Sequence, residues 1–138
     1  MATARDLMHT GCTCVKSNDT AANAARMMAE LDVGSMPICG ADDDKLHGMV
    51  TDRDLVLQVM AKGHDPETYT VDQLPQGHLF LADANEDVDL TIAKMKEHQI
   101  SRLPVIDQGR LVGIISLGDI AHRMPESVTG DLAGSIKS

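Results

Sequence analysis

The sequence predicts an α/β (α+β) protein in which two tandem β-α-β-β-α repeats pack as a pseudo-two-fold pair. The first observation is internal similarity: residues 33–39 resemble residues 100–106, and residues 46–55 resemble residues 111–120. The second is the register, because the offset is 67 residues for the first pair and 65 for the second. The difference falls in a polar Gly/Asp stretch, as a hairpin loop tolerates. The third is composition: 43% of the 138 residues are apolar, which is enough to form a hydrophobic core.

Each element of the repeat has its own sequence signal. A short strand is expected at 12–15 and again at 79–82. Polar residues at 18–20 and 85–87 then provide helix caps. Apolar residues spaced by three and four predict helices that start at Ala21 and Val88. Two apolar strands follow in each copy, at 36–39 and 46–50 and at 103–106 and 111–115, and a second helix begins at Thr51 or Ser116.

The two copies account for nearly the whole chain. We expect repeat 1 at residues 3–63, a linker at 64–69 and repeat 2 at 70–124. The 67-residue offset also places residues 3–7 over residues 70–74. Residues 125–138 are polar and contain Gly and Ser, so we expect a loosely held tail.

Composition disfavours several classes of function. The formal net charge of −9 opposes nucleic-acid binding, and two aromatic residues cannot form a base-stacking platform. No apolar run is long enough to span a bilayer, and no signal peptide is evident, so we expect a cytoplasmic protein without a membrane partner. The histidines show no metal-ligand spacing, and no nucleophile motif is present. We therefore expect neither a metal site nor an enzyme.

The most informative motif is Gly-h-h-[Thr/Ser]-x-x-Asp, where h is apolar, at residues 48–54 and 113–119. It lies where a strand becomes a helix, a place that favours anionic or polar ligands. The hydroxyl can donate to a ligand oxygen, and the Asp can accept from a ribose diol. The same spacing is also a helix capping box, and Thr3 with Asp6 is expected to be only that. Recurrence in two matched copies favours a ligand role for Asp54 and Asp119.

These motifs resemble the CBS (cystathionine β-synthase) domain, of which two copies form a Bateman module. The resemblance covers residues 3–124 and includes the apolar-Pro strand of each copy. It implies a regulatory module that binds an adenosine compound (AMP, ADP, ATP or S-adenosylmethionine) in clefts between the repeats, without a catalytic cofactor. It also implies a homodimer that signals through an effector protein or through its oligomeric state.

The resemblance assigns residues to two clefts. One would use Ile114, Ser116 and Asp119 together with Thr10, Thr13, Val33 and Gly34. The other would use Met49, Thr51 and Asp54 together with His78, Phe80, Ile100 and Ser101.

Basic residues for phosphate are few, which makes the two clefts unequal. Arg102 matches a phosphate-contacting position of the family, and Arg53 follows Thr51 at a helix start. Ser35 stands at the place of Arg102 in the other copy. Nothing provides a triphosphate clamp, so AMP or ADP is expected in preference to ATP.

The three cysteines allow a second interpretation. An odd count is not a disulfide framework, and thiols are the default in a reducing cytoplasm. The family sheet places the first strand beside the second, so Cys14 and Cys39 would be neighbours able to form a disulfide. Cys12 would share the face of Cys14 but lies less deep in the strand. The alternative function is a ligand-independent stress-response interaction protein stabilised by this bridge.

Overall fold

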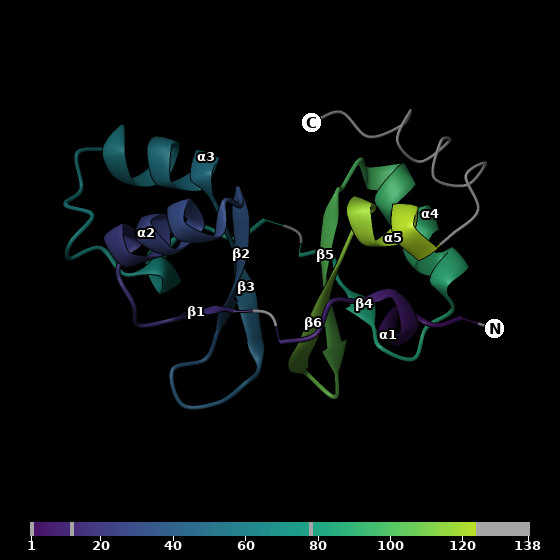
Figure 1. Cartoon of the computed structure of the whole chain (residues 1–138). Helices are drawn as coiled ribbons and strands as arrows, with labels where there is room; N and C mark the ends of the chain where they lie inside the picture. Colours follow the sequence, from purple (N-terminus) through teal and green to yellow (C-terminus); the bar gives the residue numbers. More distant parts are fainter. Residues whose placement is uncertain (1, 12, 78, 124–138) are drawn as a thin grey trace. The chain divides into compact units, whose positions relative to one another are not determined.

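The structure is a computed structural model of the chain, and it describes residues 2–11, 13–77 and 79–123. The chain forms two compact units (Figure 1). The N-unit is residues 13–79, and the C-unit combines residues 1–12 with residues 80–138. The predicted tail at 125–138, Cys12 and His78 lie outside the described residues.

The predicted mixed α/β class is confirmed, because each unit has a three-stranded sheet with helices. The N-unit contains β1 (Val15–Lys16), α2 (Ala21–Leu31), β2 (Ser35–Cys39), β3 (Leu46–Thr51), α3 (Asp52–Asp54), the π-helix η1 (Leu55–Met60) and the 3-10 helix η2 (Val71–Gln73). The C-unit contains α1 (Ala4–Leu7), β4 (Ala82–Asp83), α4 (Val88–His98), β5 (Arg102–Asp107), β6 (Arg110–Ser116) and α5 (Leu117–Arg123).

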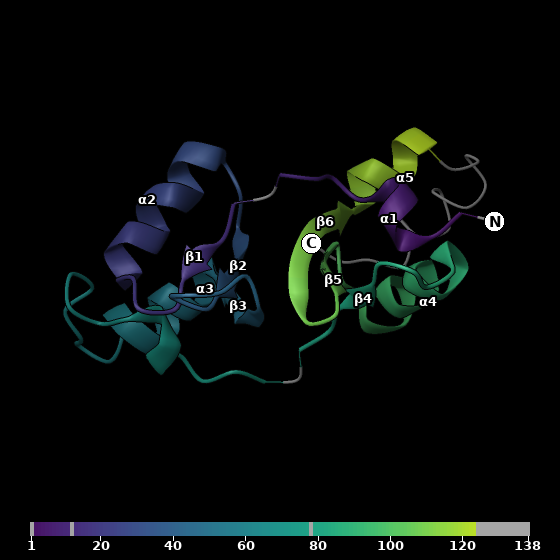
Figure 2. The ribbon, with the colours of Figure 1, turned by 90° about the horizontal axis from the view of Figure 1, so that it is seen from below.

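The two sheets have the same topology. Their strand orders are β1-β2-β3 and β4-β5-β6, with the first pair parallel and the second antiparallel. In each unit the longer helices lie on one side of the sheet, as both views show (Figure 1 and Figure 2). The side chains of β2 and β5 are largely buried, so these strands carry the core of their units, as the apolar runs predicted.

The first strand of each unit is shorter than predicted. Residues 12–15 and 79–82 were expected to be strands, but β1 and β4 have two residues each and start at Val15 and Ala82. Val15 pairs with Ile38, so the preceding position on β2 is Pro37. Proline has no N–H to donate to a ladder, which explains why regular pairing starts only after it. Pro104 has the same effect on β4.

Each unit is completed by a short helical turn from the other sequence repeat. In the C-unit, Ala4 and Leu7 of α1 are buried in the core cluster, and the Ala4 N–H donates to the Glu86 carbonyl oxygen at 3.0 Å. In the N-unit, the Val71 N–H of η2 donates to the Asp19 carbonyl oxygen at 2.9 Å. The compact units and the sequence repeats are therefore different divisions of the chain.

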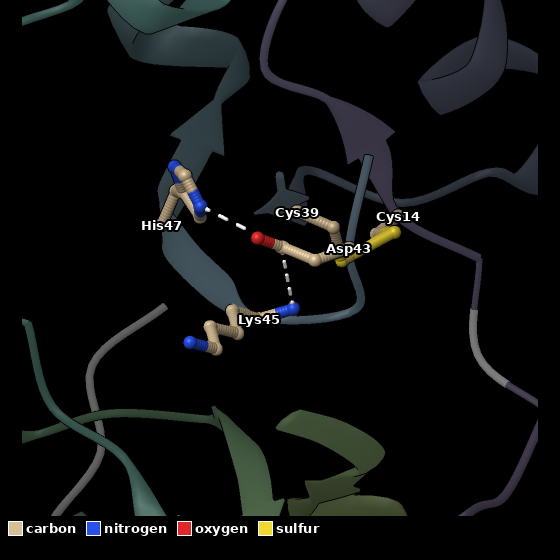
Figure 3. The surroundings of a disulfide bond; sticks show 5 residues. All are labelled: Cys14, Cys39, Asp43, Lys45 and His47. Atoms are coloured by element: carbon tan, nitrogen blue, oxygen red, sulfur yellow. Dashed lines mark hydrogen bonds and ion pairs between the residues drawn. A yellow bond between two sulfur atoms is a disulfide. The ribbon is translucent and has the colours of Figure 1, made fainter. Parts of the chain in front are cut away.

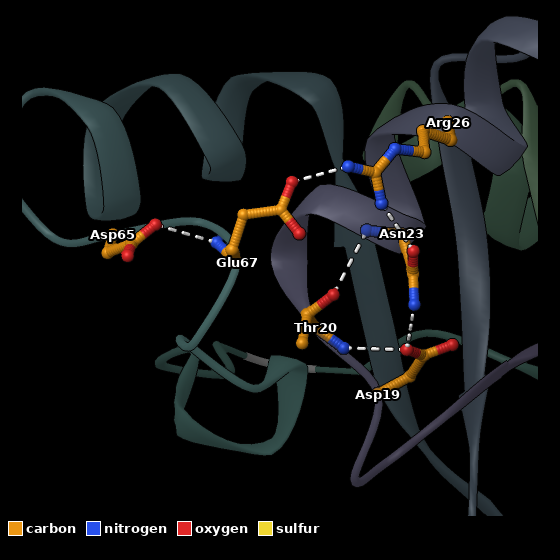
Figure 4. Close-up of polar contacts among 6 residues, drawn as sticks. All are labelled: Asp19, Thr20, Asn23, Arg26, Asp65 and Glu67. Carbon is orange, nitrogen blue, oxygen red and sulfur yellow. Dashed lines mark hydrogen bonds and ion pairs between the residues drawn. The ribbon is translucent and has the colours of Figure 1, made fainter.

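Residues 64–69, expected as a linker, form hydrogen bonds with the start of α2. The Ala22 N–H donates to the Pro66 carbonyl oxygen at 2.9 Å, and Arg26 forms an ion pair with Glu67 (Figure 4). The Thr20 hydroxyl accepts from the Asn23 N–H at 3.1 Å, which is the cap that the polar residues predicted. No helix in the described ranges combines the length and apolarity needed to cross a membrane.

Candidate functional site

Both copies of the Gly-h-h-[Thr/Ser]-x-x-Asp motif form complete capping boxes at a strand-to-helix junction. In the N-unit, the Asp54 N–H donates to the Thr51 Oγ1 at 3.0 Å, and the Thr51 N–H donates to Asp54 Oδ2 at 3.0 Å. In the C-unit, the corresponding distances for Ser116 and Asp119 are 3.1 and 2.9 Å. Each Asp carboxylate is therefore held by the backbone N–H of the Thr or Ser three residues before it.

Capping leaves part of each carboxylate available. Both boxes use Oδ2, and among the described residues Oδ1 of Asp54 and of Asp119 accepts no hydrogen bond. Both side chains are partly exposed. The hydroxyls differ, since Ser116 donates its proton to Asp119 Oδ2 at 2.9 Å, whereas no such bond exists from Thr51 to Asp54. The capping role and a ribose-binding role are thus chemically compatible.

The sheet register places a cation beside only one of the two boxes. Arg102 is the Cα partner of Ser116 in the β5–β6 ladder, and Ser35 is the partner of Thr51 in the β2–β3 ladder. Residues directly opposite in an antiparallel pair project from the same face. The guanidinium group of Arg102, which is partly buried, therefore belongs to the same face as Ser116.

The residue that follows the motif hydroxyl and starts the helix also differs between the two junctions: it is Asp52 in the N-unit and Leu117 in the C-unit. The Asp52 N–H donates to the Gly34 carbonyl oxygen at 3.0 Å, and the Leu117 N–H donates to the Ser101 carbonyl oxygen at 2.9 Å. These bonds are equivalent and fix Gly34 and Ser101 at the helix start. Asp52, however, brings a carboxylate that accepts from the Arg53 N–H at 2.8 Å, whereas Leu117 is apolar. Because Arg53 offsets the charge of Asp52, the two helix starts have the same net charge, and the N-unit junction differs in being polar where the C-unit junction is apolar.

The motif glycine and the apolar residue after it lie against a crossing segment, which the sequence interpretation missed. The Ile114 N–H donates to the His9 carbonyl oxygen at 3.1 Å, and the His9 N–H donates back at 2.7 Å. The Met49 N–H donates to Gln76 Oε1 at 3.1 Å. A Cβ at Gly113 would lie 2.9 Å from the His9 backbone carbonyl oxygen, which favours glycine there, whereas at Gly48 the nearest atom is the end of the flexible Gln76 side chain. The 67-residue offset relates His9 to Gln76 and was the available signal.

The predicted cleft residues are divided between the units. The N-unit holds Thr13, Val33, Gly34, Met49, Thr51, Arg53 and Asp54, and the C-unit holds Thr10, Phe80, Ile100, Ser101, Arg102, Ile114, Ser116 and Asp119. Because both predicted clefts draw on both units, the grouping into clefts stays a prediction. Within the C-unit, Phe80 stacks on His98 with ring centroids 4.1 Å apart. His98 was not predicted as a site residue.

The structure contains a disulfide between Cys14 and Cys39, whose Cα atoms are 5.9 Å apart. Their separation is within the range that a disulfide spans. Cys39 is the last residue of β2, and Cys14 immediately precedes β1. Among residues 2–11, 13–77 and 79–123, no group of three or more His, Cys, Asp or Glu side chains is arranged to hold a metal ion.

Glu86, just before α4, is hydrogen-bonded to two side chains of that helix, those of Thr91 and Lys94. Glu86 accepts from Lys94 Nζ at 2.8 Å, from the Thr91 hydroxyl at 2.7 Å and from the Asp83 N–H at 2.9 Å. Burial alone would raise the pKa of Glu86. The three hydrogen bonds and the charge of Lys94 outweigh burial and hold that pKa below its ordinary value.

Comparisons with known proteins agree with this architecture. A model of the CBS domain family matches residues 4–61 and 71–126. Hypoxic response protein 1 of Mycobacterium tuberculosis is 48% identical over 126 residues, which cover 91% of this chain and 87% of that protein. Residues 36–40, 46–54 and 97–105 resemble segments of the actinobacterial hypoxic response protein, in agreement with this identity over most of the chain.

Two solved structures have a fold similar to that of this chain. A crystal structure of a hypoxic response protein with two coordinated zinc ions has a TM-score of 0.81 and 48% identity, covering 90% of this chain and 100% of that chain. The crystal structure of CBSX2 in complex with AMP has a TM-score of 0.74 and 23% identity, covering 88% and 95%. The chain therefore belongs to the CBS domain family and carries two copies of the domain.

Proposed function

We propose that this protein is a non-enzymatic regulatory CBS pair that binds an adenine nucleotide, AMP or ADP in preference to ATP. The observation that carries the proposal is the pair of matched junctions, each with a fixed Asp whose Oδ1 is uncommitted among the described residues. A ribose diol can donate to such an oxygen. The AMP bound to CBSX2 shows that a protein of this fold accepts such a ligand.

The two junctions differ in the support they give to phosphate. Arg102 is opposite Ser116, whereas Ser35 is opposite Thr51, where the charges of Asp52 and Arg53 offset each other. A charge-assisted hydrogen bond to phosphate contributes about 1.5–3 kcal/mol, or roughly tenfold to a hundredfold in affinity. We therefore expect one tighter site per chain, at Ser116 and Asp119.

Isothermal titration with AMP, ADP, ATP and S-adenosylmethionine tests this proposal. It is supported by saturable binding of AMP or ADP with one site tighter than the other. It is rejected if no adenosine compound binds below millimolar concentration.

We also propose that the chain forms a homodimer and transmits its signal to an effector protein. The supporting observation is an apolar hollow of about 250 Å³ in the N-unit, lined mainly by small or apolar residues of α2 and η1, including Ala22, Ala25 and Val59. Met60, which lines the hollow, is 67% exposed, and Val56 on the same helix η1 is 52% exposed. A second copy that covers this face would remove those side chains from water.

The alternative function, a ligand-independent stress-response interaction protein, also has a supporting observation. Both Asp residues already have a structural role as caps, and the disulfide stiffens the N-unit without any ligand. The relationship to hypoxic response protein 1 fits either function. Absence of nucleotide binding, together with a stable dimer, would favour this alternative.

A further inference from the structure

The two residues of the disulfide differ in their access to solvent. Cys39 ends β2 and is only 2% exposed, whereas Cys14 immediately precedes β1 and is partly exposed. Figure 3 shows the bond between them beside the loop that joins β2 to β3. A dissolved molecule therefore reaches the disulfide more readily at Cys14 than at Cys39.

Cys39 lies in a fixed and enclosed part of the N-unit. Its carbonyl oxygen accepts from the Ser17 N–H at 2.8 Å. At the next residue, Gly40, a Cβ would lie 2.1 Å from Asp43 Oδ1, so the loop closes tightly over this end of β2. None of these contacts involves the sulfur atom. The backbone of Cys39 therefore has supports that do not depend on its bond to Cys14.

Cys14, in contrast, stands at the edge of the paired region. β1 has only two paired positions, and the first of them is Val15. Val15 is fully buried in the core of the N-unit, while Thr13, on the other side of Cys14, is exposed. A group attached to the sulfur of Cys14 can therefore be accommodated towards solvent with Val15 still in the core. The same group on Cys39 would have to enter a filled interior.

The C-unit holds the equivalent residue without a disulfide. Leu81 precedes β4 as Cys14 precedes β1. Its carbonyl oxygen accepts from Lys94 Nζ at 2.8 Å, and at the place of Lys94 the N-unit has Met27, whose side chain has no donor. Small thiols attack a disulfide but not a hydrogen bond of this kind. Thiol chemistry at this position of the repeat is therefore confined to the N-unit.

We propose that Cys14 is a modification site at which a low-molecular-weight thiol forms a mixed disulfide, and that Cys39 is the buried thiol that reverses the reaction. The attacking thiolate forms an S–S bond with Cys14 Sγ, and the bond to Cys39 breaks. Cys39 leaves as a thiolate, which takes a proton from water. One S–S bond replaces another, so the step needs no separate oxidant or reductant. The site lies within the N-unit and does not depend on nucleotide binding.

Access decides which sulfur is attacked. A sulfur that stays buried is the poorer leaving group, which by itself would favour attack on Cys39 with Cys14 leaving. At 2% exposure, however, Cys39 can be reached only when the N-unit opens locally, and that opening costs free energy. The return step has no such barrier, because Cys39 lies beside Cys14 and expels the small thiol when it attacks Cys14 Sγ.

Peptide mapping by mass spectrometry identifies the modified sulfur. Oxidised Cys12→Ser protein, which has only the two bonded cysteines, is incubated with reduced glutathione, then denatured in acid and alkylated with N-ethylmaleimide. We expect glutathione on Cys14 and the maleimide on Cys39, in a protein whose circular dichroism before denaturation is unchanged. Glutathione on Cys39, an even distribution over both residues, or reduction that passes through no mixed disulfide would overturn the proposal.

Two single-thiol variants provide the matched comparison. In the Cys12→Ser background, Cys39→Ala leaves only the Cys14 thiol, and Cys14→Ala leaves only the Cys39 thiol. With oxidised glutathione, Cys14 is expected to form the mixed disulfide about tenfold faster or more, because a buried thiol reacts only after local opening. In urea that unfolds the protein, the two rates should become similar. Equal rates in the folded variants, or a faster reaction at Cys39, would overturn the assignment of the site to Cys14.

Discussion

Arg102 is the direct cross-strand partner of Ser116 at the first position of the β5–β6 ladder, and in the other unit the same position pairs Ser35 with Thr51. This pairing places the Arg102 guanidinium group on the same face as the Ser116–Asp119 junction. The Ser35 hydroxyl lies on the same face as the Thr51–Asp54 junction. It is the difference between the two sites that bears most directly on phosphate binding.

The first prediction follows from this pair. Arg102→Ser copies the residue of the other repeat and removes the cation, so the affinity for AMP at the tighter site should fall about tenfold to a hundredfold. Adenosine, which lacks phosphate, should bind the variant as it binds the parent. Titration calorimetry with both ligands distinguishes a phosphate contact from a structural role. Equal losses for AMP and adenosine would show that Arg102 supports the fold and not the phosphate.

The second prediction concerns the disulfide. It closes a loop with a sequence separation of 25 residues, so breaking it should lower the free energy of unfolding by about 3 kcal/mol. Urea denaturation of oxidised and reduced protein measures this difference. Peptide mapping of oxidised protein under non-reducing conditions should give a link between residues 14 and 39. A link between residues 12 and 39, or no link, would contradict the pairing.

The third prediction uses the carboxylate of Glu86, whose pKa is lowered in the folded state. A lowered folded pKa means that ionised Glu86 stabilises the protein fully above its ordinary, unfolded pKa. This contribution is lost as the pH falls through the lower folded pKa. Glu86→Gln should therefore be less stable than the parent at pH 7, and the difference should shrink in acid. Denaturation at a series of pH values tests the trend, which a constant difference at all pH values would refute.

The fourth prediction concerns association. Light scattering of the parent should give about twice the chain mass of 14.8 kDa. Met60→Glu places a charge beside the apolar hollow and should favour the monomer, because an uncompensated charge in an interface is costly. Gln108→Glu adds the same charge in the exposed β5–β6 turn and should leave the mass unchanged. A parent mass near 15 kDa across micromolar concentrations would contradict the dimer.

Much of the fold was predictable because the repeat keeps its chemistry in register. The buried strands β2 and β5 and the helices α2 and α4 follow from apolar spacing and from caps such as Thr20. The lengths of β1 and β4 were mispredicted because strand length depends on the partner strand. Pro37 limits the β1–β2 ladder, and Pro104 limits the β4–β5 ladder. The crossing of α1 into the C-unit is a long-range packing choice that no local pattern specifies.

The candidate site was predictable to the same extent. The spacing of Thr51 with Asp54 and of Ser116 with Asp119 identified both junctions, but one pattern encodes both a cap and a ligand site. The contacts of His9 and Gln76 with the motif strands depend on tertiary structure and have no local signal. The anchoring of Leu81 by Lys94 likewise joins residues that are 13 positions apart.

The most direct test of nucleotide binding compares calorimetric titrations of AMP into the parent, Asp54→Ala and Asp119→Ala. The parent should show two unequal sites. Asp119→Ala should lose the tighter site and Asp54→Ala the weaker one, because each change leaves a ribose diol without its acceptor. Asp6→Ala is the control, since its capping box has no ligand role and should cost at most about 1 kcal/mol of stability with binding unchanged. If both Asp variants bind AMP as the parent does, or if the parent binds none below millimolar concentration, the two junctions are only helix caps.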